Sequence, residues 1–217
     1  MIARMLRQGS RDSGVELSEA MVASFELFAT ELKTWNRKIN LTAITRDEDI
    51  AVKHFMDSLY PAQLLDGAER LLDIGSGAGM PAIPLKIVLP GLRVVSVDAV
   101  GKKIHFQRHM ARLLQFKQFE ALHARVETLH ATRPGAFDVI ISRAFSSLTT
   151  FVSLAGPLLA DNGRMVAMKG AAAAEELSSE GDRLQQLGYQ ISAEHNYELP
   201  FGSGKRCLIV ITPFKSP

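Results

Sequence analysis

A short apolar segment that contains an acid and leads into a glycine-rich turn is the feature that most limits how this chain can fold. Residues 71–74 are Leu-Leu-Asp-Ile, and three glycines spaced two apart follow at Gly75, Gly77 and Gly79. Aliphatic residues resume at position 83. The pattern predicts a strand, a tight turn and a helix, because glycine supplies positive φ and lets a ligand approach the backbone. Turns of this kind hold nucleotides.

The spacing inside the turn separates the nucleotides that such turns bind. The dinucleotide fingerprint G-x-G-x-x-G requires a third glycine where this chain has Met80, so it does not fit. An acid two residues before G-x-G-x-G, here Asp73, is typical of methyltransferases that use S-adenosylmethionine (AdoMet). A carboxylate there attracts the ammonium or sulfonium group of a ligand that has no pyrophosphate. The alternative is a tight strand–helix turn that binds no ligand.

A second acid ends the next predicted strand, residues 92–98. Asp98 lies 23 positions after Gly75, which places it at the carboxyl end of the neighbouring parallel strand. A carboxylate there can accept both ribose hydroxyls of an adenosine. The alternative is that Asp98 caps the helix beginning near Lys102. The loop after the strand predicted at 119–123 reaches the same edge, where the backbone at Val126 and Glu127 would contact the adenine.

Strands and helices alternate along most of the chain, which predicts a parallel sheet with right-handed crossovers. Further strands are expected at 137–142 and 164–168, and helices at 102–114, 148–159 and 175–188. The last two strands, 190–197 and 207–212, have no helix between them and should form an antiparallel edge hairpin. We therefore expect an α/β fold, the Rossmann-like class I AdoMet-dependent methyltransferase fold, with a mostly parallel seven-stranded sheet in residues 61–217.

Residues 1–60 should form an N-terminal helical extension packed on that domain. Positions 1–14 are polar and basic, which predicts a frayed terminus, with a phosphate-contacting arm as the alternative. Ser18 is expected to cap a helix whose apolar face packs on the core, and Asp47 a second helix through about residue 59. That helix carries His54 and Asp57, for which packing and hydrogen bonding are favoured over a role as acid and base.

Composition excludes several classes of function. The 217 residues carry a formal charge of +2, so only local clustering can argue for nucleic acid. The single cysteine, Cys207, excludes an internal disulfide and a cysteine-rich metal site, and its place in a predicted strand argues against a cysteine nucleophile. No apolar run is long enough to cross a membrane, and no signal peptide is evident. We expect a cytoplasmic protein that binds no metal.

Basic residues gather where the carboxyl end of the predicted sheet should lie. Arg143 follows strand 137–142 at the edge that faces the methyl group, and Lys169, Lys205 and Arg206 should lie around it. Such a rim attracts RNA phosphates, and the alternative is scattered solubilising charge. The segment Ser142–Phe145 also lacks the Pro-Pro motif typical of enzymes that methylate exocyclic amines. An acceptor atom with a free lone pair would need no general base. Guanine N7 is such an atom, and it pairs with Arg or Lys.

From about residue 35 to residue 170 the chain resembles the glucose-inhibited division protein B family, the 16S ribosomal RNA guanine-N7 methyltransferases. The residues that carry this resemblance keep the family's order and spacing. They are Trp35, Asn36, Asn40–Thr42, His54, Asp57–Leu59, Leu72–Pro81, Ile83–Leu85, Lys102, Lys103, Ser142–Phe145, Lys169 and Gly170. One departure is Ala82, where the family usually has glycine.

The resemblance implies a site and a substrate. AdoMet would lie against Gly75, the Met80 backbone, Val126–Glu127 and Arg143, with Asp98 on the ribose. Arg143 would also position the acceptor, and no residue would act as nucleophile. The RNA would be held by the basic residues Arg125, Lys169, Lys205 and Arg206. The implied substrate is one guanosine of 16S rRNA, in the RNA itself or a small-subunit assembly intermediate, and we expect a monomer.

Two other functions remain open from the sequence. One is a methyltransferase of the same fold that acts on a small molecule and does not need the basic rim. The other is a non-catalytic RNA-binding assembly factor that keeps AdoMet only as a structural ligand.

Overall fold

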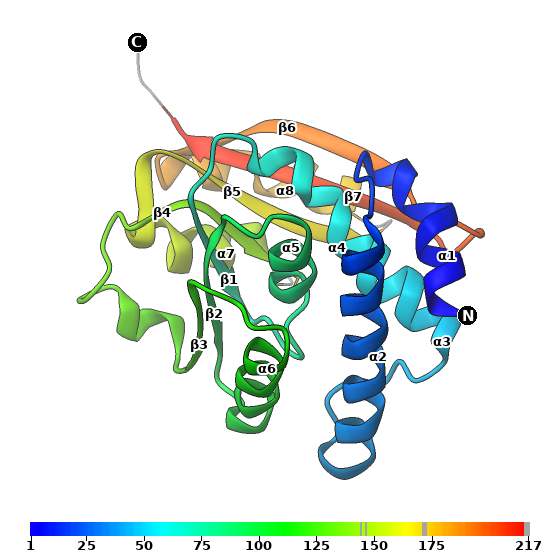
Figure 1. The fold of residues 1–217 in the computed structure, drawn as a ribbon. Coiled ribbons are helices and arrows are strands. Elements are labelled where there is room, and N and C mark those ends of the chain that lie inside the picture. The colour runs from blue at the N-terminus through cyan, green and yellow to red at the C-terminus, as the bar shows by residue number, and fades with distance from the viewer. Residues whose placement is uncertain (144, 146, 171–172, 215–217) are drawn as a thin grey trace.

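A single seven-stranded sheet forms the centre of the molecule in the computed structural model, which describes residues 1–143, 145, 147–170 and 173–214 (Figure 1). The strand order is β3-β2-β1-β4-β5-β7-β6. The first five strands are mutually parallel, and β7 runs antiparallel to both β5 and β6. The predicted fold is therefore confirmed. The strands are β1 Arg70–Ile74, β2 Arg93–Asp98, β3 Phe119–His123, β4 Phe137–Ser142, β5 Leu159–Gly170, β6 Tyr189–Glu198 and β7 Lys205–Pro213.

Helices cover the sheet, and those that precede β1 form a layer beside α5 and α6 (Figure 1). The helices before β1 are α1 Ile2–Gly9, η1 Ser10–Ser13, α2 Glu19–Ile39, α3 Asp47–Asp49, the π-helix η2 Ile50–Met56, α4 Asp57–Leu59 and η3 Tyr60–Leu65. Those after β1 are α5 Ala82–Val88, α6 Gly101–Leu113, η4 Val126–Leu129, α7 Leu148–Ala155, η5 Gly156–Leu158 and α8 Ala173–Gln186. None of the described helices is long and apolar enough to cross a membrane.

An aromatic cluster joins the N-terminal helices to the sheet domain. Phe25 and Phe28 of α2 each lie within about 5 Å of the Phe55 ring, with centroid distances of 5.1 and 5.2 Å, and Phe106 of α6 lies 6.0 Å from Phe28. All four rings are fully buried. The Ser18 hydroxyl caps α2 by accepting the Met21 N–H at 3.3 Å. The predicted core-facing helix and its cap are thus confirmed.

Three expectations for the N-terminal region are wrong. The first residues are not frayed, because α1 places Ile2 and Leu6 four apart on one face and buries both. Asp47 does not cap the next helix, because it is the first residue of α3, with Arg46 at the N-cap position, and its carboxylate pairs with Lys33 at 2.6 Å. The segment after it is also not one regular α-helix, because residues 50–56 widen into a π-helix. Such a local widening cannot be read from apolar periodicity.

Strand ends also differ from the predicted ones near the C-terminus. The strand expected at 164–168 begins earlier, at Leu159, and the helix expected through 159 ends at Ala155. Lys205 and Arg206 precede the strand predicted at 207–212, but both belong to β7, where Arg206 pairs with Gly170 and Lys205 with Glu198. Backbone pairing on both sides of β7 therefore extends the strand beyond its predicted start. Residues 171–172, in the alanine-rich stretch, and Ala144, in the motif after β4, lie outside the described residues.

Candidate functional site

The glycine turn after β1 has the conformation that the sequence predicts. Gly75, Gly77 and Gly79 have φ of 71°, 59° and 92°. A Cβ added to Gly79 would collide with the Ile83 side chain, so that glycine serves helix packing. A Cβ added to Gly77 would meet nothing within 4 Å, so the middle of the turn faces open space. This is the position at which a ligand can reach the backbone.

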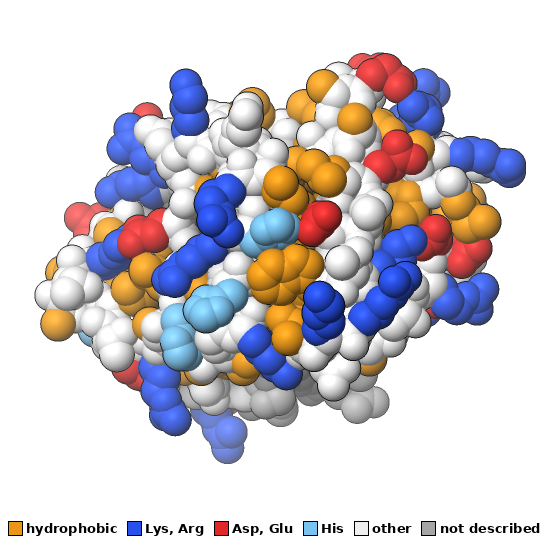
Figure 2. All heavy atoms as spheres, turned by 60° about the horizontal axis from the view of Figure 1, so that its bottom comes forward, with side chains coloured by type: hydrophobic (Ala, Val, Ile, Leu, Met, Phe, Trp, Pro, Cys, Tyr) orange, Lys and Arg blue, Asp and Glu red, His pale blue; other side chains and the backbone are white. Residues whose placement is uncertain are grey.

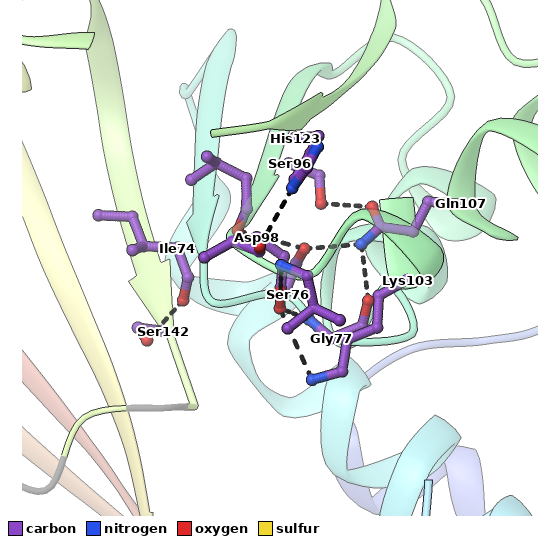
Figure 3. A network of polar contacts seen from close by, with 12 residues as sticks. Ile74, Ser76, Gly77, Ser96, Asp98, Lys103, Gln107, His123 and Ser142 are labelled. Atoms are coloured by element: carbon purple, nitrogen blue, oxygen red, sulfur yellow. Dashed lines mark hydrogen bonds and ion pairs between the residues drawn. The ribbon is translucent and has the colours of Figure 1, made fainter. Parts of the chain in front are cut away.

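Asp98 lies beside the turn at the carboxyl end of β2, as predicted (Figure 3). Its Oδ2 accepts the Gly77 N–H at 2.9 Å, and its Oδ1 accepts the Val100 N–H at 2.8 Å. The Lys103 ammonium is 3.9 Å from Oδ2, and Asp98 is only 8% exposed. The carboxylate therefore fixes the glycine turn and the start of α6 together. Each oxygen keeps a second lone pair that a ligand hydroxyl can use.

A buried polar network that the sequence analysis missed holds the turn from behind (Figure 3). The Gln107 amide donates to Ser76 Oγ at 2.7 Å and to the Gly77 carbonyl at 2.8 Å. Ser96 Oγ donates to Gln107 Oε1 at 2.5 Å, and all three side chains are buried. Because every member has a partner, the network fixes the turn in one geometry. A glutamine on an otherwise apolar helix face was the only signal of it.

Asp73 lies beneath the turn and is fully buried. Its Oδ2 accepts the Ala82 N–H at 3.1 Å, which anchors the start of α5, while Oδ1 is buried and has no hydrogen-bond partner among the described residues. Burial raises the pKa of Asp73 well above its usual range, and the Ala82 N–H and Arg143 act against that rise. A buried carboxylate with one unpaired oxygen favours a cationic neighbour.

The loop after β3 forms the short helix η4 and lies next to β2. The Ala124 N–H donates to the Asp98 carbonyl at 3.3 Å, which brings the loop to the same sheet edge. Val126 is buried, whereas Arg125 and Glu127 are exposed. The structure thus brings the loop that carries these three predicted site residues to the end of β2, where Asp98 lies.

The other predicted basic residues meet at this carboxyl edge from three strands. Arg143 follows the end of β4, Lys169 is near the end of β5, and Lys205 and Arg206 begin the antiparallel β7. Lys169 Nζ donates to the Phe145 carbonyl at 2.8 Å. Lys and Arg side chains are also spread across the middle of the face in Figure 2, with most acidic side chains toward its margins. The structure thus places Arg143, Lys169, Lys205 and Arg206 at the sheet edge where the sequence predicts them, and their contact with RNA stays a prediction.

Arg143 is held by the N-terminal helices, which the sequence did not show. Its Nη2 donates to the Lys53 carbonyl at 3.2 Å and lies 3.5 Å from Asp57 Oδ2, and its Nη1 is 3.5 Å from Ser58 Oγ. The Tyr197 hydroxyl donates to Asp57 Oδ1 at 2.8 Å. These partners are 85 to 140 positions apart in the chain. The only signal was the spacing of His54, Asp57 and Ser58, for which packing was favoured.

His54 itself does fill a packing role. It is 8% exposed, and its Nε2 lies 2.9 Å from Thr42 Oγ1. Burial and the nearby Arg143 lower its pKa to about 4, so the imidazole is neutral at pH 7. Among the described residues, no group of His, Cys, Asp and Glu is arranged to hold a metal ion.

The chain matches one family of known proteins over most of its length. The family model described as GidB, rRNA small subunit methyltransferase G, matches residues 21–199. The chain belongs to this family. Two relatives with the name ribosomal RNA small subunit methyltransferase G support the membership. The one from Geobacter sulfurreducens is 50% identical over 208 residues, which is 96% of each chain. The one from Geobacter metallireducens is 51% identical over 207 residues, or 95% of this chain and 94% of the relative.

Solved structures agree on the fold. A SAM-dependent methyltransferase from Aquifex aeolicus matches 70% of this chain and 88% of its own length, with a TM-score of 0.53 and 18% identity. At that identity the likeness shows the class I methyltransferase fold alone. The GidB family match begins inside α2, so it includes the π-helix and Asp57 that hold Arg143.

Proposed function

We propose that this protein transfers the methyl group of AdoMet to N7 of a specific guanosine in 16S ribosomal RNA. The observation that carries the proposal is the near-complete match, at about half identity, to relatives named ribosomal RNA small subunit methyltransferase G. The geometry supports it, because an open glycine turn and a cluster of positive side chains lie at one edge of a methyltransferase sheet.

AdoMet would bind over the glycine turn. Gly75 and Gly77 allow its close approach, and Asp98 would accept the ribose hydroxyls with its remaining lone pairs. Val126 and Glu127 would contact the adenine. The Met80 N–H already donates to the Ser76 carbonyl at 2.9 Å, so Met80 would contribute its own carbonyl. The buried Asp73, with its unpaired Oδ1, would favour the positive charge of the ligand from below.

The reaction needs alignment more than acid–base chemistry. When bound, AdoMet would supply an activated methyl carbon: the N–C bond to guanine N7 would form as the S–C bond breaks, leaving a neutral thioether and passing the positive charge to the guanine. No proton moves, so no residue has to act as a base or nucleophile. Arg143 would hold guanine O6 and the donor so that N7, carbon and sulfur lie in line, and such positioning is a large source of rate.

The basic rim would hold the RNA. Arg125, Lys169, Lys205 and Arg206 would contact phosphates around the target guanosine. Each phosphate contact adds to the salt dependence of binding. We further propose that the protein acts as a monomer, in the cytoplasm where ribosomes assemble, and on RNA that is already partly assembled into the small subunit.

Methyl transfer from labelled AdoMet tests this function directly. The protein is incubated with 16S rRNA, with partly assembled small subunits, or with 23S rRNA as the control. We expect label in the 16S rRNA of the partly assembled subunits, more than in free 16S rRNA, and none in 23S rRNA. The label should lie in a single guanosine whose N7 methylation is confirmed by borohydride and aniline cleavage. The rate at subsaturating RNA should fall steeply between 50 and 200 mM salt, as expected when several phosphates are contacted.

The same experiment separates the alternatives. Label in small molecules but never in RNA, with little effect of salt, would identify a small-molecule methyltransferase. RNA binding without transfer to any acceptor would identify an assembly factor.

A further inference from the structure

One buried carboxylate of the N-terminal helices lies between the two arginines of the proposed site. Asp57, the first residue of α4, is 3% exposed. Arg143 Nη2 is 3.5 Å from its Oδ2, and Arg206 Nε is 3.9 Å from its Oδ1. Asp57 therefore touches the residue proposed to align the acceptor and a residue proposed to hold the RNA. Neither the family match nor the relatives' names assign it a role.

The surroundings of Asp57 fix its position. The Tyr197 hydroxyl donates to Oδ1 at 2.8 Å, and Tyr197 stacks on Tyr60 with ring centroids 3.9 Å apart. Burial and the Asp57 charge raise the pKa of Tyr197, so its hydroxyl remains a donor. The π-helix that precedes Asp57 presents the Lys53 carbonyl to the same Arg143 guanidinium. Single π-helical turns occur often at functional sites.

The spacing of the charges differs from that of a structural ion pair in the same molecule. Asp138 binds Arg70 at 2.6 Å and also accepts the backbone N–H groups of Glu69 and Arg70, at the amino end of the sheet. Asp57 instead keeps 3.5 and 3.9 Å from its two guanidiniums. At that distance it attracts and orients both groups while their N–H donors can still bind a ligand.

We propose that Asp57 is a positioning residue for methyl transfer. Its carboxylate orients the Arg143 guanidinium toward the acceptor and attracts the Arg206 guanidinium from its other oxygen. The inference rests on the proposed function, because it assigns to Arg143 the alignment of donor and guanine. It also gives the N-terminal helices a part in the site, since without them Arg143 would lose Lys53, Asp57 and Ser58 together.

The test is a cycle of Asp57→Asn and Arg143→Ala on single-turnover methyl transfer and on AdoMet affinity. Asp57→Asn keeps the side-chain shape and an oxygen for Tyr197, but removes the charge. We expect it to slow transfer about 10²-fold, as misplacement of an aligning group does, and to weaken AdoMet about tenfold. In the Arg143→Ala protein the same change should alter either quantity less than twofold, because Asp57 acts through Arg143.

A matched control removes a carboxylate that has only a structural role. Asp138→Asn should lower stability and leave the rate per folded molecule unchanged. Tyr197→Phe is the milder second variant in case Asp57→Asn does not fold, and it should slow transfer severalfold with Arg143 present and not without it. Equal losses in both backgrounds, or normal transfer by Asp57→Asn, would overturn the positioning role. If the wild-type protein methylates no RNA, the proposed function is wrong. The AdoMet affinities of the four proteins in the cycle would then still show whether Asp57 acts through Arg143.

Discussion

The two halves of the proposed site are built in different ways. The glycine turn is held by residues from adjacent elements, within about 30 positions of each other, and its contacts with Asp98 and Gln107 are 2.7 to 2.9 Å long. The other half is the arginine edge, which consists of Arg143, Arg206 and Asp57. It is assembled from the N-terminal helices and the ends of β4, β6 and β7, and the two guanidiniums lie 3.5 and 3.9 Å from the Asp57 carboxylate. The first half is thus held by hydrogen bonds within the protein itself.

This difference suggests a division of labour. A donor such as AdoMet is the same in every reaction cycle, so a preorganised turn binds it without loss of conformational freedom. An RNA acceptor is large and must be placed as its phosphates are engaged, so a looser set of guanidiniums around one carboxylate suits it. The comparison therefore predicts that variants of the turn affect mainly donor affinity, whereas variants of the edge affect mainly transfer.

The largest effect should come from Arg143→Ala. Loss of the guanidinium that aligns donor and acceptor should lower the rate of methyl transfer by about 10³-fold, the upper end of the range for one preorganised donor. Circular dichroism and the unfolding midpoint should show an intact fold. Single-turnover kinetics with saturating AdoMet measure the effect.

Arg164→Ala is the matched control for that experiment. Arg164 donates to the carbonyls of Leu64 and Asp66, at 2.7 and 3.1 Å, near the start of β1. Its removal should leave transfer unchanged. Normal turnover by Arg143→Ala would remove that residue from the site and with it the contrast between the two halves.

The same division explains what could be predicted from the sequence. The glycine turn could be predicted, because Asp73, the three glycines and Asp98 follow a local pattern whose strand register places them together. The contact that positions Arg143 could not be predicted, because Asp57 and Arg143 are brought together only by tertiary packing, and a π-helix leaves no periodic signal. The start of β7 was missed for a related reason, since pairing with β5 and β6 extends a strand into a Gly-rich segment.

The next effect in size is on AdoMet affinity. Asp98→Ala removes a charged acceptor for the ribose, which should weaken AdoMet by about 1.5–3 kcal/mol in calorimetry. Asp138→Ala serves as the control, because that carboxylate also accepts two backbone N–H groups but lies at the opposite end of the sheet. It should change stability and not affinity. An unchanged affinity in Asp98→Ala would refute the ribose contact.

Buried titratable groups should give the two halves opposite dependences of stability on pH. His54, behind the arginine edge, has a pKa lowered from 6.5 to about 4. Below pH 6.5 the unfolded chain therefore binds a proton that the folded protein does not bind until about pH 4. The free energy of unfolding thus decreases as the pH is lowered through this range. The loss attributable to His54 should reach about 2 kcal/mol at pH 5. Asp73, beneath the turn, has a raised pKa, so the unfolded chain releases this proton at a lower pH than the folded protein does. The free energy of unfolding attributable to Asp73 therefore decreases as the pH rises above the range in which an ordinary aspartate titrates.

Urea denaturation at pH 5 and pH 7 separates these contributions. His54→Gln keeps a hydrogen-bonding group for the Thr42 hydroxyl and should lose about 2 kcal/mol less than wild type between pH 7 and pH 5. Asp73→Asn should gain stability relative to wild type as the pH rises. A difference between wild type and His54→Gln that stays constant over this range would show that the imidazole is not held neutral.

The smallest effect is the sharpest test of the open turn. Gly77 and Gly67 have φ of 59° and 71°, and an added Cβ would meet nothing within 4 Å at either position. Alanine at each should therefore strain the backbone alike, by about 1 kcal/mol. Only at Gly77 would the alanine side chain also occupy the space in which AdoMet is proposed to lie. Gly77→Ala should thus weaken AdoMet in calorimetry beyond any change in Gly67→Ala, although both lose similar stability. Equal affinities in the two variants would mean that the space in front of the turn is not where AdoMet binds.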